Sequence, residues 1–446
     1  FCFHPDEVLK REDLIKQMEE LNKSKAKTVN LDLVDEQLRQ DRERRVMAKA
    51  VWRRRWAVLC CCFCIVLIAA PAALIVYFAM GSWTAVCYGS EGGACGFEAR
   101  ADFGVAYTPD GRVLVVAGRD GTRNFGDVWE GSPVDGNFKL VLADAPFGAR
   151  HGHALLCDVA GGGRLFLLGG DAGGVNGDSI RPLRDVWVSE TGAGWKLQTS
   201  SAPWVGRKYM GAAFDGASHM FVIGGFDNHG AGGLNDVWRS DDEGITWSIV
   251  SWVAPWSGRH SHGLVVLPAG STAPGRMYIL GGNNGILLHD VWSSNDGGST
   301  WEIVKFTHTR EMRYTVREER ASWLPRESMA CAVGPDGTLT LTGGNVDGEG
   351  DARFSQEVWQ LPPPPTTEIA WYEKKTSDDR LNFAFPPLEW AKESEPTWGA
   401  RRGHQSFVDG DGVVYVVGGE GSDGIFRADL WRMEKSVDLN NLRDVY

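Results

Sequence analysis

The sequence lacks a basic surplus over most of its length. The whole chain has a formal net charge of −12, and residues 1–56 carry 14 Lys+Arg against 11 Asp+Glu. The remaining 390 residues therefore carry a net charge of −15. Nucleic-acid binding depends on a basic surface that neutralises phosphates. We therefore expect no nucleic-acid partner.

The sequence also lacks the common motifs of metal and phosphate sites. It has no paired CxxC motifs, no phosphate-binding loop and no recognisable Ser-His-Asp arrangement. We expect no cofactor and no catalytic residues from these patterns. Cys87 and Cys95 are close enough in sequence to form a disulfide in an oxidising compartment.

A run without charge covers residues 57–80 and predicts a single transmembrane helix. Arg53, Arg54 and Arg55 precede it, and no Lys or Arg follows until Arg100. The positive-inside rule then predicts an integral, single-pass membrane protein with its N-terminus on the cytoplasmic, matrix or stromal side. No Asn-x-Ser/Thr sequon follows the run, which favours an organelle inner membrane over the plasma membrane.

Residues 1–56 predict a charged helical arm, because apolar residues recur in it at near-helical spacing. The arm is either a docking element for another subunit or a solvated helix beside the membrane. A cysteine cluster at the start of the uncharged run has two interpretations as well. Its cysteines pack in lipid, or they are acylated at Cys60, Cys61 and Cys62.

The rest of the chain is repetitive and rich in Gly (56) and Trp (19), which favours turns and strands. Six apolar strands end in Gly or a Gly doublet, and each is followed by a shorter strand that ends in Trp. The six tryptophans are Trp129, Trp187, Trp238, Trp292, Trp359 and Trp431. A second aromatic follows in five units, at Phe138, Trp195, Trp247, Trp301 and Trp371. The last unit lacks its outer strand, and Trp83–Val86 matches the missing sequence.

These repeats resemble the kelch family, whose members include the central domain of galactose oxidase. The resemblance implies an all-β fold, a six-bladed kelch-type β-propeller over residues 81–433, with a tail over 434–446. Residues 83–86 would supply the outer strand of the last blade. Ser240–Trp247 and Ser294–Trp301 resemble the Asp-box of sialidase-like propellers, which implies structural hairpins without catalysis.

Each repeat also carries an arginine before its first strand. By resemblance, these arginines ring the channel mouth, where they either bind an acidic peptide or hold neighbouring blades together. They are Arg100, Arg150, Arg207, Arg259, Arg326 and Arg402.

Two insertions interrupt the repeat, over 305–325 and 362–398, and insertions in propellers map to the faces where partners bind. They are candidate contact loops or linkers. Their candidate contact residues are Arg310, Arg313, Arg317, Trp371, Phe383, Phe385 and Trp390.

The copper centre of galactose oxidase needs two His and two Tyr that converge on the axis. The His-x-His pairs at 151–153 and 260–262 fall at one repeat position, where packing beside a strand is the ordinary role and metal binding the alternative.

We therefore expect no enzyme but a non-catalytic, membrane-anchored interaction or scaffold module. It would be an accessory subunit of a larger membrane complex. Its partners would be other membrane-protein subunits and the lipid bilayer, through residues 57–80. The alternatives are a copper oxidase or glycan-active enzyme at the propeller mouth, or a surface receptor for glycans or acidic peptides.

Overall fold

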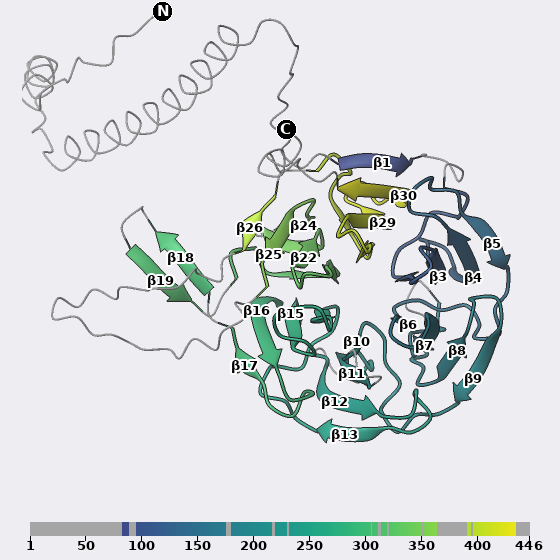
Figure 1. Cartoon of the computed structure of the whole chain (residues 1–446), viewed down its shortest axis with the longest axis horizontal. Helices are drawn as coiled ribbons and strands as arrows, with labels where there is room; N and C mark the ends of the chain where they lie inside the picture. Colours follow the sequence, from purple (N-terminus) through teal and green to yellow (C-terminus); the bar gives the residue numbers. More distant parts are fainter. Residues whose placement is uncertain are drawn as a thin grey trace, which may run out of the picture. The chain divides into compact units, whose positions relative to one another are not determined.

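The computed structural model describes residues 83–88, 95–174, 180–215, 219–229, 232–304, 306–310, 314–318, 321–348, 351–363, 390–393 and 396–433. Across these ranges the protein is all-β, with antiparallel strands and no helix. Most strands belong to four-stranded sheets that follow one another along the chain and lie around a common centre (Figure 1).

The first four sheets share one strand order, in which each strand pairs with the next along the chain. The first comprises β2 (Gly104–Tyr107), β3 (Val113–Arg119), β4 (Asn124–Gly131) and β5 (Lys139–Leu142). The second comprises β6 (Ala154–Asp158), β7 (Arg164–Leu168), β8 (Val186–Ser189) and β9 (Trp195–Thr199). The third comprises β10 (Gly211–Phe214), β11 (Met220–Gly225), β12 (Leu234–Ser240) and β13 (Ser248–Ser251). The fourth comprises β14 (Gly263–Val266), β15 (Met277–Asn283), β16 (Leu287–Ser294) and β17 (Glu302–Ile303).

The fifth sheet comprises β21 (Ala330–Val333), β22 (Leu339–Thr342), β25 (Val358–Leu361) and β26 (Ala391–Lys392). Short ladders accompany it along the chain: β18 (Phe306–Arg310) with β19 (Tyr314–Glu318), and β20 (Arg326–Glu327) with β23 (Asn345–Gly348) and β24 (Asp351–Phe354). The sixth comprises β28 (Gln405–Val408), β29 (Val414–Gly421), β30 (Phe426–Met433) and β1 (Trp83–Cys87), with β27 (Arg401–Arg402) also on β29.

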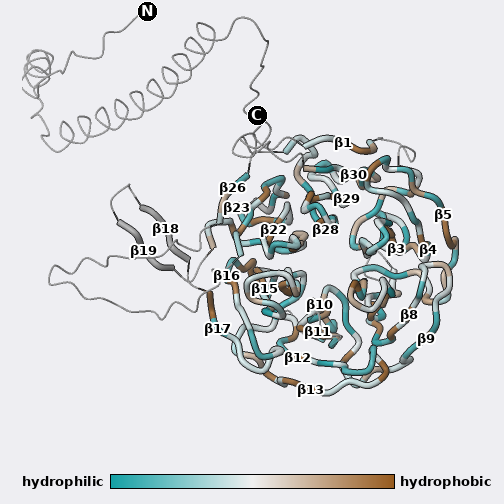
Figure 2. The backbone as a smooth tube through the Cα atoms, in the orientation of Figure 1, coloured by the Kyte–Doolittle hydropathy of each residue, from teal (hydrophilic) through white to brown (hydrophobic). Residues whose placement is uncertain are grey.

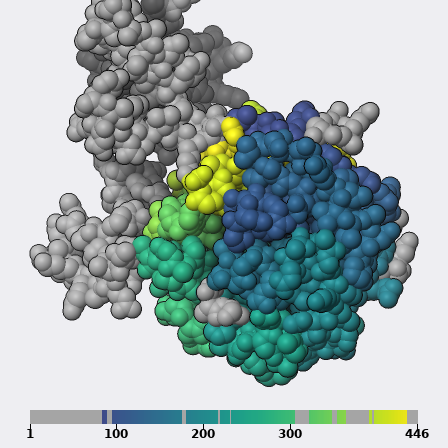
Figure 3. Space-filling view, turned by 45° about the vertical axis from the view of Figure 1, so that its right-hand side comes forward, coloured from purple at the N-terminus to yellow at the C-terminus, as the bar shows by residue number. Residues whose placement is uncertain are grey.

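The sixth sheet joins the two ends of the described chain. Strand β1 pairs with β30, with Trp83 opposite Met433 and Ala85 opposite Trp431. Figure 3 shows the yellow C-terminal strands against the purple and blue N-terminal part. The pairing expected for Trp83–Val86 is therefore present.

The innermost strands contact one another in a closed cycle. Strand β2 contacts β6, and the contacts continue through β10, β14, β21 and β28 back to β2. The arrangement is propeller-like, and hydrophobic stretches recur around the ring (Figure 2). The second strand of each sheet is buried on both faces, as Val113–Val116 in β3 illustrates, which explains its continuous apolar sequence.

Hydrogen bonds between main-chain groups close the same cycle around the channel. Six residues, one before each innermost strand, have φ between 52° and 62°. The N–H of each donates to the carbonyl of its counterpart in the preceding sheet, over 2.8–3.0 Å, and the first donates to the last. They are Asp102, Gly152, Tyr209, Ser261, Ser328 and Gly403, and we call them the channel ring.

Aromatic pairs fill the outer part of each sheet, where the space between sheets widens with radius. In each pair, an aromatic at the start of the outer strand, or one residue before it, meets an aromatic from the segment that leads into the same sheet. The rings meet edge to face, with centroids 5.1–6.1 Å apart. The pairs are Phe97–Phe138, Phe147–Trp195, Trp204–Trp247, Trp256–Trp301, Trp323–Trp390 and Trp398–Trp83. The outer aromatic of the fifth sheet is therefore Trp390, and its assignment to Trp371 was wrong.

The Asp-box hairpins lie between the third and fourth strands of the third and fourth sheets. Asp242 accepts hydrogen bonds from the main-chain N–H and the hydroxyl of Thr246, at 2.8 and 2.6 Å. Asp296 does the same with Thr300, and the indole of Trp301 donates to the Gly298 carbonyl. These polar groups are occupied in bracing the turns.

The membrane prediction is corrected. Among the described residues, no helix is long and apolar enough to cross a membrane, so the expected single-pass protein with its N-terminus on the cytoplasmic side is not supported. The arm (1–56), the uncharged run (57–80) with Cys60, Cys61 and Cys62, and the tail (434–446) lie outside the described residues.

A disulfide joins Cys87 to Cys95, with 5.4 Å between the Cα atoms. Cys87 ends β1 in the sixth sheet, whereas the carbonyl of Cys95 accepts a hydrogen bond from the N–H of Phe138 beside the first sheet. The bond therefore links the closing strand to the sheet on its other side.

We predict that the double variant Cys87→Ala/Cys95→Ala has a free energy of unfolding about 2–3 kcal/mol lower than that of the wild type, because the cross-link no longer restrains the unfolded chain. Urea denaturation of the oxidised wild type and the variant measures the difference. Reduction of the wild type should reproduce most of the loss, whereas equal midpoints in all three samples would contradict the prediction.

Candidate functional site at the channel mouth

The repeated arginines lie inside the sheets and not at the channel mouth. Their side chains are 0–2% exposed, which excludes contact with a partner. The members of this set are Arg100, Arg150, Arg207, Arg259, Arg326 and Arg401. The predicted ring of arginines available to an acidic peptide is therefore wrong for five of its six members.

Each guanidinium is held within its own sheet by the same partners. In the third sheet, Arg207 donates to both carboxylate oxygens of Asp236, at 2.6 and 2.7 Å, and to the Gly224 carbonyl at 2.7 Å. The indole of Trp238 donates to the same carboxylate at 2.8 Å. This explains the repeated acidic residue two positions before each third-strand tryptophan. The other ion pairs are Arg100–Asp127, Arg150–Asp185, Arg259–Asp290, Arg326–Glu357 and Arg401–Asp429.

The main chain of the same arginine is bonded to the preceding sheet. The N–H of Arg207 donates to the Leu183 carbonyl, and its own carbonyl accepts from the N–H of Gly170. One residue thus connects two neighbouring sheets. Its side chain bonds its own sheet, and its backbone bonds the preceding sheet. Between the last and first sheets, the Arg100 carbonyl accepts from Gly419. The alternative interpretation of these arginines, as links between blades, matches this geometry.

Arg402 differs from the other five predicted arginines because the repeat position in the sixth sheet belongs to Arg401. Arg402 follows it and lies at the channel mouth with a 35% exposed side chain. In Arg401-Arg402-Gly403-His404, either arginine could fill the repeat position. An aromatic lies three residues before every buried arginine, and here that aromatic is Trp398, which identifies Arg401.

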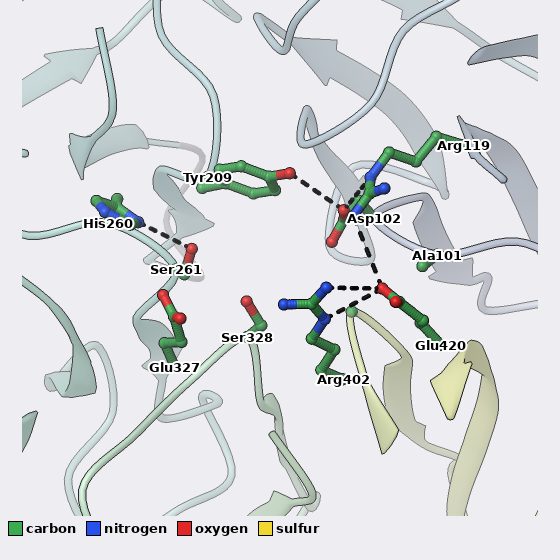
Figure 4. Close-up of a pocket in the computed structure, with 11 residues that line it drawn as sticks. Ala101, Asp102, Arg119, Tyr209, His260, Ser261, Glu327, Ser328, Arg402 and Glu420 are labelled. Carbon is green, nitrogen blue, oxygen red and sulfur yellow. Dashed lines mark hydrogen bonds and ion pairs between the residues drawn. The ribbon is translucent and has the colours of Figure 1, made fainter. Parts of the chain in front are cut away.

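A cavity of about 150 Å³ opens at this mouth (Figure 4). Its lining comes from the residues just after the buried arginines, from the channel ring and from the residues that follow the Gly doublets. The lining residues that carry charge are Asp102, Arg119, Glu327, Arg402 and Glu420. Arg402 is a candidate from the sequence, whereas the other four are not, because they occupy repeat positions whose chemistry changes from sheet to sheet.

Asp102 is a largely buried carboxylate of this cavity, with a 9% exposed side chain. It accepts hydrogen bonds from Arg119 at 2.7 Å and from the Tyr209 hydroxyl at 3.1 Å. Burial tends to raise the pKa of Asp102, but neighbouring charges, chiefly that of Arg119, and the hydrogen bonds from Arg119 and Tyr209 together hold the pKa below its ordinary value. Burial and the charge of Asp102 raise the pKa of Tyr209 well above its ordinary value, so Tyr209 stays a neutral phenol.

The other cations of the mouth are paired with carboxylates as well. Arg402 donates to Glu420 through Nε and Nη2, at 3.1 and 3.0 Å, and Lys208 donates to Asp171 at 2.7 Å. Glu327 differs, because its carboxylate oxygens accept from the amides of Asn283 and Asn345, at 3.0 and 3.1 Å. Among the described residues, it is the one carboxylate of the cavity without an ion pair.

A second cavity of about 110 Å³ shares residues of the channel ring with the first. The side chains that follow the channel ring line it: Phe103, His153, Met210, His262, Met329 and His404. Each of the three histidines packs against a glycine of the preceding sheet, as His262 does against Gly211. Burial lowers the pKa of His153, His262 and His404 to about 3, so all three are neutral.

The described residues contain no group of three or more His, Cys, Asp or Glu that could hold a metal ion. In the first His-x-His pair, His151 contacts the side-chain oxygen of Asn124 at 3.0 Å, while His153 lies beside Gly104. In the second, His260 contacts the Ser261 hydroxyl. The packing role expected for these pairs fits this arrangement.

The side chains of most predicted insertion contacts lie outside the described residues: Arg310, Arg313, Arg317, Trp371, Phe383 and Phe385. Trp390 is described, and its role as a surface contact is corrected. It is 3% exposed and packs against Trp323, because it serves as the outer aromatic of the fifth sheet.

Neither the models of known protein families nor the curated proteins give a match to this sequence.

We predict that Arg207→Met lowers the free energy of unfolding by about 3–5 kcal/mol, because it leaves the Asp236 carboxylate buried without its cation. Chemical denaturation measures the loss. Arg123→Met is the control, since Arg123 pairs with Glu98 on the surface and its loss should cost less than about 1 kcal/mol. Similar losses in both variants would contradict the structural role.

We also predict that acid destabilises the protein below pH 6.5. The buried histidines bind protons in the unfolded chain at a pKa near 6.5 but in the folded protein only near 3, so the folded state loses stability as the pH falls. Each contributes a loss of about 2 kcal/mol between pH 6.5 and 5.

The matched variant is His262→Met, because methionine occupies the same repeat position at Met210 and Met329. Unfolding measured at pH 7 and pH 5 should show a smaller pH dependence in His262→Met than in the wild type. An unchanged pH dependence would show that His262 is not a buried neutral group.

Proposed function

We propose that the protein is a non-catalytic interaction module, a six-bladed kelch-type β-propeller that docks a partner protein on the face around its channel mouth. Its role would be that of a scaffold or accessory subunit. The kelch resemblance of the repeats supports the fold assignment, together with the closed cycle of sheets.

A set of exposed apolar side chains at one end of the sheets carries the proposal. Connections from the second to the third strand, and from one sheet to the next, lie at the mouth end, because both adjoin the channel ring and the Gly doublets. These connections bear Val205, Trp252, Val253, Ile286, Leu324 and Ile425, each at least 41% exposed. We call this set the mouth face. Large exposed apolar side chains around a polar centre are typical of protein-binding surfaces.

The chemistry of the mouth supports binding over catalysis. The cations Arg119, Lys208 and Arg402 are paired with carboxylates, and Tyr209 is held neutral by its raised pKa. A nucleophile or general base needs a pKa shifted towards neutrality, and the shifts of Asp102 and Tyr209 go the other way.

The test compares partners that copurify with the wild type and with variants of two faces. We expect Ile286→Asp and Ile425→Asp, both at tips of the mouth face, to reduce recovery of a stoichiometric partner at least tenfold, because each buries a charge in the interface. Val159→Asp is the matched control, because Val159 is similarly exposed in the turn between β6 and β7 at the other end of the sheets.

Equal loss in the Val159→Asp control, or no loss in either mouth variant, would contradict docking at the mouth face. Stoichiometric copper in the purified protein would contradict the non-catalytic role itself. Circular dichroism of each variant verifies that the sheets remain folded.

A further inference from the structure

We infer that the mouth cavity receives a cationic side chain, lysine or arginine, from the docked partner, with Glu327 as its counter-ion. This inference rests on the proposed function, since it names the chemistry of the contact at the centre of the mouth face.

Charge balance in the cavity points to a cation. The lining contains three carboxylates, on Asp102, Glu327 and Glu420, and two guanidiniums, on Arg119 and Arg402. Arg119 is paired with Asp102, and Arg402 with Glu420. One negative charge, that of Glu327, therefore remains, and one monovalent cation would neutralise it.

The position of Glu327 is fixed before any ligand arrives. Asn283 donates to one carboxylate oxygen and Asn345 to the other, so two neighbouring sheets hold the group at the cavity wall. Figure 4 shows Glu327 on the side of the cavity formed by His260 and Ser261, away from Glu420. A preorganised carboxylate loses little conformational entropy when it binds.

The cavity also matches a side chain in size and hydrogen bonding. About 150 Å³ accommodates a charged head group with several methylenes, and the hydroxyls of Ser261 and Ser328 line the wall beside Glu327. Ammonium and guanidinium groups are donors without acceptors, so carboxylate and hydroxyl oxygens are suitable partners. His260 adds no competing charge, because burial lowers its pKa.

The experiment measures binding of three probes by isothermal titration at low salt. They are Nα-acetyl-lysine methylamide, its neutral norleucine analogue and its anionic glutamate analogue. We expect the lysine probe to bind at least tenfold more tightly than either analogue, and added salt to weaken its binding. Preference for the glutamate probe would assign the cavity to anions through Arg402 and would overturn the inference.

Glu327→Gln removes the charge and keeps an acceptor oxygen for one asparagine. It should lower the affinity for the lysine probe at least tenfold. Glu98→Gln is the control, because Glu98 is an exposed carboxylate outside the cavity. The affinity of this variant for the lysine probe should stay within twofold of that of the wild type. Unchanged binding in Glu327→Gln would overturn the inference.

The same variant separates this inference from the proposed function. A partner that is lost with Ile286→Asp but retained fully with Glu327→Gln would leave docking at the mouth face intact and refute the cationic contact. Loss of the partner in both variants supports both statements.

Discussion

The structure depends on one arginine per sheet that bonds in two directions. Its guanidinium fixes the acidic residue and the Gly-doublet carbonyl of its own sheet, and its backbone bonds the sheet before it. A buried charge is costly unless it is paired, and the acidic residue supplies that pair within the sheet. The backbone bonds to the preceding sheet form only when the two sheets are assembled. Since the link recurs between neighbouring sheets and between the last and the first, loss of one link affects the closure of all six sheets.

Repetition decided what the sequence could predict. Five sheets carry a Gly doublet and the first carries Ala117-Gly118, and all six carry the tryptophan and the buried arginine. These six imperfect copies indicated the all-β architecture and the strand supplied by Trp83–Val86. The same reasoning placed the arginines at the wrong depth, because spacing along the chain does not show whether a side chain points to solvent or into the sheet. Where two residues of the same type could fill one repeat position, spacing alone favoured Arg402 over Arg401 and Trp371 over Trp390.

The cavity could not be predicted because it is built from positions that do not repeat. The residues immediately after the six buried arginines are Ala101, His151, Lys208, His260, Glu327 and Arg402. Two of them are histidine, and the others differ in charge and size. A position that varies while its neighbours stay constant has no structural requirement, and such positions surround the channel mouth. The repeated residues therefore hold the sheets together, whereas the residues at the varying position determine the chemistry of the channel mouth.

The pairing of β1 with β30 has a consequence for biosynthesis. Trp83 leaves the ribosome long before Met433, its partner in the sheet, and translation at about 5–20 residues per second separates the two by roughly 17–70 seconds. During this interval β1 is an unpaired strand, and unpaired strands associate readily with other chains. The disulfide between Cys87 and Cys95, which needs none of the later chain, would anchor the waiting strand beside the first sheet until the last one emerges.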